Sequence, residues 1–167
     1  MALQPTATRL WKHLPPEDRL AAATAFFAEP APELASAALG ALVKARHLRP
    51  QAARALPADA RSRILATVLD PGEPLAQGLL VSLHLAQRRP LLRAFLDALG
   101  LAHEDGVLKE EAASTEPVPL ETAREAVAAL ATFPPAEVRT YFNTLWLQDP
   151  DRWAALEGAS DWLSPEG

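Results

Sequence analysis

Three segments of this chain repeat one pattern of proline, acidic and arginine residues, and the repetition constrains the fold more than any other feature. Each copy begins with an apolar residue and a proline, continues with an acid and an arginine, and ends with an acid–proline pair about 15 residues later. The copies open at Leu14–Arg19, Leu56–Arg61 and Phe133–Arg139, and they end at Glu29-Pro30, Asp70-Pro71 and Asp149-Pro150. This pattern predicts a helix with a fixed beginning and end in every copy.

The chemistry of the pattern explains why each copy forms a helix. A proline in the first turn costs no hydrogen bond, and the acid beside it faces the positive end of the helix dipole. The residue before the closing proline is disfavoured in helical geometry, so the helix stops there. Because acids and arginines recur in every copy, we expect them to form helix starts and ion pairs between helices, not a catalytic site. They are Glu17, Asp59 and Glu137 with Arg19, Arg61 and Arg139.

The spacing of the copies organises the chain into repeat units of about 41 residues. We expect a single all-α domain of short antiparallel helices over 1–167, with repeat-like units at 14–55 and 56–99. An acidic loop and linker at 101–119 then precedes a partial third unit at 120–163. Within the linker the sequence predicts a short helical piece near Val107–Ala113 and an extended stretch at Ser114–Pro119. Gly40 and Gly78 fall inside predicted helices, which indicates close approach of a neighbouring helix at each.

A helix-pair repeat of this length resembles the HEAT and armadillo type of α-solenoid, whose units run about 40–47 residues. The resemblance rests on period and helix order across residues 14–99 and ends after Gly100, where the register breaks. It implies stacked helix pairs around a continuous core. A compact helical bundle with an internal duplication fits the same pattern.

Several classes of protein are disfavoured by what the sequence lacks. There is no cysteine, which excludes disulfides, thiolate metal sites and a cysteine nucleophile. The longest apolar stretch, around Leu79–Ala86, is broken by Ser82 and His84 and is far shorter than the roughly 20 residues of a membrane span. No apolar run follows a basic stretch at the N-terminus, so no signal peptide is expected. We therefore expect a cytoplasmic protein with no membrane contact and no cofactor.

Residues that carry catalytic or metal chemistry do not form a known motif. The histidines contain neither a His-x3-His pair nor the HExxH motif, and no nucleophile elbow or phosphate-binding glycine loop is present. His84 lies in a helix that is apolar nearly all round, which favours a core residue with one ring hydrogen bond over a buried base. His103-Glu104-Asp105 is followed by Gly106 and is typical of a polar turn. The chain is therefore expected not to be an enzyme, and neither a catalytic nor a metal-binding residue is assigned.

A basic cluster in the first two repeat units offers one candidate surface. It comprises Lys44, Arg46, Arg49, Arg54, Arg61 and Arg63, and its counterparts one repeat later are Arg88, Arg89 and Arg93. If the repeats stack, the two sets form one basic stripe that could hold a phosphate backbone. The alternative is that several of these cations only complement the dipoles of helix C-termini.

Aromatic residues gather near the C-terminus and offer a second candidate surface. Tyr141, Trp153 and Trp162 are the proposed contact residues, because aromatic side chains carry much of the binding energy at protein interfaces. The alternative is that these rings cap the core where the repeats end.

The sequence-based hypothesis is a non-catalytic helical-repeat scaffold that binds another protein. Nucleic-acid binding through the basic stripe is the first alternative, and a ligand-binding or enzymatic bundle using His84 or His103 is the second. Residues 1–100 carry 12 Lys and Arg against 8 Asp and Glu, whereas residues 101–167 carry 4 against 13. Electrostatic fields of opposite sign on the two halves can steer a partner or favour self-association, so a homo-oligomer also stays open. The alternative is that the two halves lie beside each other and neutralise each other.

Overall fold

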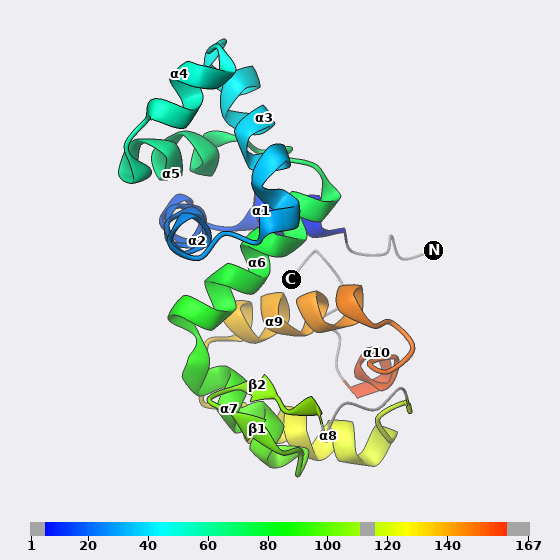
Figure 1. Cartoon of the computed structure of the whole chain (residues 1–167). Coiled ribbons are helices and arrows are strands. Elements are labelled where there is room, and N and C mark those ends of the chain that lie inside the picture. The colour runs from blue at the N-terminus through cyan, green and yellow to red at the C-terminus, as the bar shows by residue number, and fades with distance from the viewer. Residues whose placement is uncertain (1–5, 111–115, 160–167) are drawn as a thin grey trace. The chain divides into compact units, whose positions relative to one another are not determined.

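A computed structural model describes residues 6–110 and 116–159, and it confirms an all-α fold. The helical elements are α1 (Ala7–His13), α2 (Pro16–Ala28), the 3-10 turn η1 (Pro32–Leu34), α3 (Ala35–Arg46), α4 (Pro50–Ala55), α5 (Ala58–Thr67), α6 (Glu73–Gln87), α7 (Arg89–Ala98), α8 (Leu120–Ala129), α9 (Pro135–Gln148) and α10 (Ala155–Ala159). Two short strands, β1 (His103–Glu104) and β2 (Val107–Leu108), lie between α7 and α8. Figure 1 shows these elements along the chain.

The repeated pattern places the helix ends as predicted. Helices α2, α4, α7 and α9 carry proline in the first turn, and α5 follows Pro57 directly. The recurring acids Glu17, Asp59 and Glu137 all lie in first turns. Helix α2 ends before Glu29-Pro30, α5 before Asp70-Pro71, and α9 before Asp149-Pro150.

The chain divides into two compact units, an N-terminal unit at Thr6–Gln87 and a C-terminal unit that begins at Arg88. The boundary between them falls between α6 and α7, inside the predicted repeat unit 56–99. The 41-residue period therefore describes the order of helices along the chain, and it does not mark the boundary between compact units.

The N-terminal unit is built around α2, which packs against α5 and α6. Helix α1 lies on α6, and α3 contacts both α4 and α5 (Figure 1). Large apolar side chains fill the space between these helices, and each of the following is at most 1% exposed: Trp11, Phe26, Leu42, Leu65, Leu75, Leu79 and Leu83.

The recurring arginines do not form the predicted ion pairs between helices. Arg19 instead donates to three backbone carbonyls, from Nε to Ala66 at 3.0 Å and from Nη1 to Leu14 at 2.7 Å and, more weakly, to Lys12 at 3.4 Å. Ala66 lies in the last turn of α5, and Lys12 and Leu14 lie at the end of α1, where backbone carbonyls lack partners within the helix. Within the described ranges Arg61 and Arg139 form no ion pair either. The prediction is wrong because a guanidinium satisfies free carbonyls at helix ends as readily as it satisfies a carboxylate.

The C-terminal unit has an aromatic core centred on Phe95 of α7. Its ring centroid lies 5.6 Å from that of Tyr141, 4.9 Å from Phe142 and 5.7 Å from Trp153. Helix α8 packs against α7 and α10. The rings thus join α7, α9 and the segment before α10 in one core.

The predicted short helix near Val107–Ala113 is wrong at its first two residues. Residues 107–108 form β2, which pairs antiparallel with β1 so that His103 opposes Leu108. Asp105 and Gly106 form the turn with φ of 49° and 87°. Two positive φ values in a two-residue loop match the twist of a hairpin, and Asp-Gly is a strong signal for that turn. Residues 111–113 of the predicted helix lie outside the described residues.

The predicted linker at Ser114–Pro119 is described from residue 116 onward. The Val118 N–H donates to the Arg152 carbonyl at 3.0 Å, so this end of the segment is attached to the C-terminal unit. None of the helices in the described ranges combines the length and the apolar character needed to cross a bilayer.

Candidate binding groove

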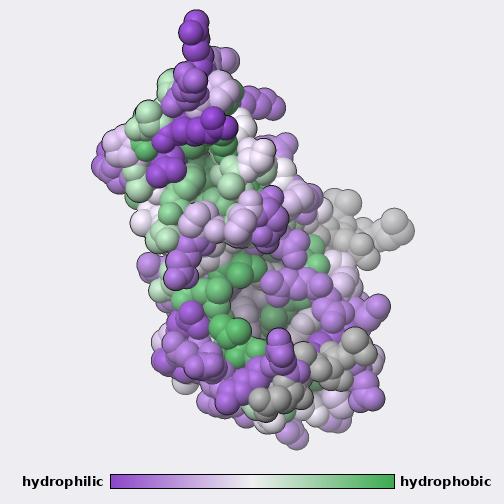
Figure 2. All heavy atoms as spheres, viewed as in Figure 1, coloured by the Kyte–Doolittle hydropathy of each residue, from purple (hydrophilic) through white to green (hydrophobic). Residues whose placement is uncertain are grey.

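A pocket of about 420 Å³ opens on the N-terminal unit among α2, α3, α4 and α5, and we call it the α2–α5 groove. Its wall is mostly apolar and comprises Phe26, Phe27, Pro30, Ala35, Ala38, Leu39, Leu42 and Ala53. The polar lining residues are Ser36, Arg54 and Arg61. In Figure 2 hydrophobic residues reach the surface in this part of the N-terminal unit, with hydrophilic residues beside them. The volume falls within the range of ligand sites in proteins.

The groove exists because large rings on α2 face small side chains on α3 and α4. Phe26 is fully buried, and its ring meets that of Phe27 edge-on, with centroids 5.4 Å apart and planes at 77°. Phe27 is only half-buried and lines the groove. The facing positions Ala38 and Ala53 are too short to fill the space between the helices. An apolar hollow therefore remains open to solvent.

Arg61 lies at the meeting point of the apolar wall and the polar rim. Its guanidinium carbon is 5.2 Å from the centroid of the Phe27 ring, within the range of a cation–π contact. The Nε atom of Arg61 is shielded from solvent and has no hydrogen-bond partner among the described residues. Arg54 of α4 is exposed and lines the same groove.

Asp59, the acid nearest to Arg54 and Arg61 in the sequence, does not neutralise these two arginines. Asp59 pairs with Arg63 along α5, with Oδ2 and Nη2 2.6 Å apart. No acid lines the groove, and neither Arg54 nor Arg61 forms an ion pair with any part of the chain that the structure describes. The groove therefore combines an apolar wall with a positive rim.

The predicted basic residues lie in both compact units. Of the predicted residues in the N-terminal unit, Arg61 is half-buried and the others are exposed, namely Lys44, Arg46, Arg49, Arg54 and Arg63. Arg88, Arg89 and Arg93 belong to the C-terminal unit. The structure therefore brings Arg54 and Arg61 together at one groove, and a single stripe through all nine residues stays a prediction.

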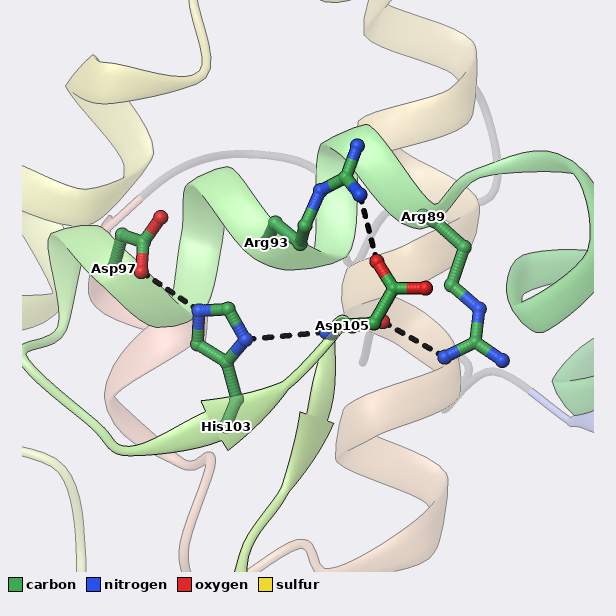
Figure 3. Close-up of polar contacts among 6 residues, drawn as sticks. Arg89, Arg93, Asp97, His103 and Asp105 are labelled. Atoms are coloured by element: carbon green, nitrogen blue, oxygen red, sulfur yellow. Dashed lines mark hydrogen bonds and ion pairs between the residues drawn. The ribbon is translucent and has the colours of Figure 1, made fainter.

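The arginines of the C-terminal unit hold the β1–β2 hairpin in place (Figure 3). Arg89 donates to the backbone carbonyl of Asp105 at 2.7 Å, and Arg93 pairs with its carboxylate at 2.6 Å. Arg88 is buried, with 6% of its surface exposed. These contacts account structurally for Arg89 and Arg93, which bind the turn of the hairpin.

His103 and Asp97 resemble two of the three groups of a catalytic triad, but their hydrogen bonds hold the hairpin turn. The His103 Nε2 atom lies 2.7 Å from Asp97 Oδ1, and Nδ1 accepts a hydrogen bond from the Gly106 N–H at 3.2 Å (Figure 3). Because Nδ1 accepts, Nε2 carries the proton of the neutral ring and donates it to Asp97. Both ring nitrogens are thus used to hold the turn, which is the polar turn that the sequence predicts.

His84 is buried in the core, as the sequence favours. It is 3% exposed, and its Nδ1 atom lies 2.7 Å from the Leu80 carbonyl one turn earlier in α6. Since a carbonyl can only accept, Nδ1 carries a proton and donates it. This arrangement matches a core histidine bonded to its own helix.

The proposed aromatic docking residues are not exposed where the structure describes them. Tyr141 and Trp153 are 5% and 3% exposed and pack against Phe95. Their burial places them in the core of the C-terminal unit, the alternative that the sequence left open. Trp162 lies outside the described residues.

Sequence reasoning missed the groove, although it singled out both of its arginines. The signal available was the Phe26-Phe27 pair together with alanine-rich helices, but only the packing shows that these face one another. No cluster of three or more potential metal ligands occurs among residues 6–110 and 116–159. Comparison with protein families, curated proteins and solved structures finds no match to the chain.

Proposed function

We propose that this chain is a non-catalytic binding module that seats apolar side chains of another protein in the α2–α5 groove. The groove itself supports the proposal, because an apolar hollow with arginines at its rim is typical of sites that anchor a partner. Binding energy at interfaces concentrates where a few bulky side chains enter such a hollow and exclude water.

The polar residues of the groove favour binding over catalysis. They are two arginines and Ser36, and no carboxylate or imidazole lines the groove to activate that hydroxyl. A serine nucleophile needs a base within hydrogen-bond reach. The arginines can orient and neutralise an anionic group but cannot accept a proton.

A peptide selection with two matched variants tests the proposal. A library of random displayed peptides is selected on the intact chain, and enriched peptides are measured against Ala35→Trp and Ala37→Trp. Both alanines are exposed near the start of α3, but only Ala35 lines the groove. We expect Ala35→Trp to weaken binding at least about tenfold by filling the groove, and Ala37→Trp to leave it unchanged. If no enriched peptide distinguishes the two variants, the groove is not the binding site.

Nucleic-acid binding is a second candidate, favoured by the exposed cations of the N-terminal unit. Lys44, Arg46 and Arg49 are all exposed, and Asp59, the one acid between residues 44 and 63, already pairs with Arg63. Phosphate contacts would make binding fall steeply with salt. A labelled DNA duplex titrated at low and high salt decides this candidate, since failure to bind at low salt rules it out.

A further inference from the structure

Arg19 and Arg61 are equivalent residues of the first two repeat copies, yet their guanidinium groups have different partners. Each lies five residues after the leucine that opens its copy. Arg19 is satisfied within the protein by the carbonyls of Leu14 and Ala66. Arg61 stacks on Phe27, and its shielded Nε has no acceptor among the described residues. In the first copy the arginine donors bind backbone carbonyls of the protein, whereas in the second copy the equivalent Nε donor lies at the groove without an acceptor among the described residues.

A shielded donor without a partner is costly, and an acceptor supplied by a ligand would remove that cost. Arg139 in the third copy gives a useful comparison. Its Nε also lacks a partner within the described ranges, but the apolar hollow beside it is only about 200 Å³ and contains no second arginine. Arg61 therefore differs from Arg139 in having both a larger hollow and Arg54 beside the same space.

The arginines and the apolar wall of the groove favour a ligand in which an anionic group lies beside an apolar group. A guanidinium presents its donors as a planar fork that matches a carboxylate. The apolar wall requires the anion to sit close to a bulky side chain, as it does when Asp or Glu neighbours Leu, Phe or Trp. A phosphate dianion is the poorer fit, because its larger charge costs more to desolvate beside the Phe27 ring and the half-buried Arg61.

We propose that the α2–α5 groove binds an acidic-hydrophobic segment of a partner protein. A bulky apolar side chain enters the hollow against Phe27, and a neighbouring carboxylate pairs with Arg61. Arg54 adds a second positive charge at the rim and steers the acid toward the groove. This inference rests on the proposed function, because it names the chemistry that the groove selects.

The peptides selected on the groove provide the test. We expect the groove-dependent peptides to carry Asp or Glu within two residues of an aromatic or aliphatic anchor. Resynthesis with Asn or Gln in place of that acid should raise the dissociation constant at least about tenfold. A phosphoserine in its place should bind no better than the acid. Groove-dependent peptides whose affinity survives the amide replacement would overturn this inference and leave the proposed function standing. An absence of groove-dependent peptides would overturn both.

Two arginines of α5 provide matched protein variants. Arg61→Gln and Arg63→Gln each remove one charge from the same helix, but Arg63 does not line the groove. We expect Arg61→Gln to abolish the preference for acid over amide and Arg63→Gln to retain it. Arg61→Lys should restore only part of it, because lysine lacks the fork. Circular dichroism checks that each variant folds. Arg54→Gln, at an exposed residue, should slow association and weaken its salt dependence. An unchanged acid preference in folded Arg61→Gln would contradict the proposal.

Discussion

Leu34 packs against the backbone of α6 at Gly78, where its terminal carbon occupies the space that a Cβ on residue 78 would fill. Leu34 ends η1, and Gly78 lies in the middle of α6, so the contact brings the chain before α3 against the longest helix of the N-terminal unit. The glycine inside this helix therefore has a packing reason, as the sequence predicts.

Replacing Gly78 by alanine should destabilise the N-terminal unit. Alanine favours a helix by up to about 1 kcal/mol over glycine, but forcing Leu34 out of its place costs about 1–3 kcal/mol. Subtracting the helix gain from the packing cost, we expect Gly78→Ala to lower the free energy of unfolding by up to about 2 kcal/mol, measured by urea denaturation. A second substitution, Leu34→Ala, should remove most of the added penalty of Gly78→Ala.

Gly40 in α3 is the control for this substitution. A Cβ built there meets no atom of the described residues within 4 Å, so the predicted close approach of a helix at Gly40 is wrong. Gly40→Ala should stabilise the chain by about 0.5–1 kcal/mol through helix propensity alone. If Gly78→Ala stabilises as much as Gly40→Ala, the packing of Leu34 is not tight.

The difference between these glycines shows where sequence reasoning stops. Both interrupt an apolar helical pattern in the same way, and only the packing of Leu34 separates them. Helix positions were predictable because proline, acid and closing proline act within a few residues of one another. Asp105-Gly106 is also a short-range signal, and it favours a hairpin turn. The prediction of a helix at this position did not take that signal into account.

The groove could not be predicted for a different physical reason. It depends on Phe27, Ala38 and Ala53 facing one another across three helices, and the repeat pattern carries no information about that distance. The pattern identified Arg61 only as a member of a recurring set. Its separate role is visible only beside Arg19, because the two side chains differ in tertiary partners.

Glu73 should stabilise the N-terminal unit in a pH-dependent way. Its carboxylate accepts the N–H groups of Ala7 and Thr8, each at 2.9 Å, and so caps the start of α1 from the start of α6. Partial burial acts to raise the pKa of Glu73, but the hydrogen bonds from Thr8, Ala7 and Thr6 outweigh it, and the pKa lies below its usual value of 4.5. We expect Glu73→Gln to lower the free energy of unfolding by about 1 kcal/mol at neutral pH.

The sign of the pKa shift fixes the pH range in which this effect appears. A carboxylate with a lowered pKa in the folded state contributes its stability above the unfolded pKa, near 4.5, and loses it as pH falls through the folded pKa. The difference between wild type and Glu73→Gln should therefore shrink as pH falls below about 4.5. Glu33→Gln is the control at neutral pH, because it changes an exposed acid that forms no hydrogen bond within the described ranges and removes no cap. A difference that stays constant down to pH 3 would contradict the capping role.

Arg19 should matter far more for stability than Arg63. Arg19 donates to the carbonyls of Leu14 and Ala66, which lose their partner when the guanidinium is removed. Arg63 forms only an exposed ion pair with Asp59, with side chains 72% and 69% accessible. We expect Arg19→Gln to cost about 2–3 kcal/mol of unfolding free energy and Arg63→Gln to change it by less than about 0.5 kcal/mol. Equal effects of the two variants in urea denaturation would show that the carbonyl contacts of Arg19 contribute little.

Tyr141 should remain neutral in the folded protein well above the pH at which tyrosines ordinarily ionise. Burial of its phenol raises the pKa of Tyr141 far above the usual value of 10.0, because the charged form would lose its hydration. Tyr141 is the only tyrosine in the chain, so tyrosinate absorbance reports on it alone. During an alkaline titration we expect that absorbance to rise together with the loss of helical circular dichroism. In denaturant it should rise near pH 10.

The raised pKa of Tyr141 also predicts how alkaline pH affects stability. The unfolded chain loses the phenolic proton above about pH 10 while the folded chain keeps it, so the free energy of unfolding should fall as pH rises above that value. Tyr141→Phe removes this ionisation and should flatten the alkaline dependence of stability between pH 9 and 11. A rise of tyrosinate absorbance near pH 10 with helical content intact would place the phenol in solvent. It would then reopen Tyr141 as a candidate for the exposed aromatic surface that the sequence suggested.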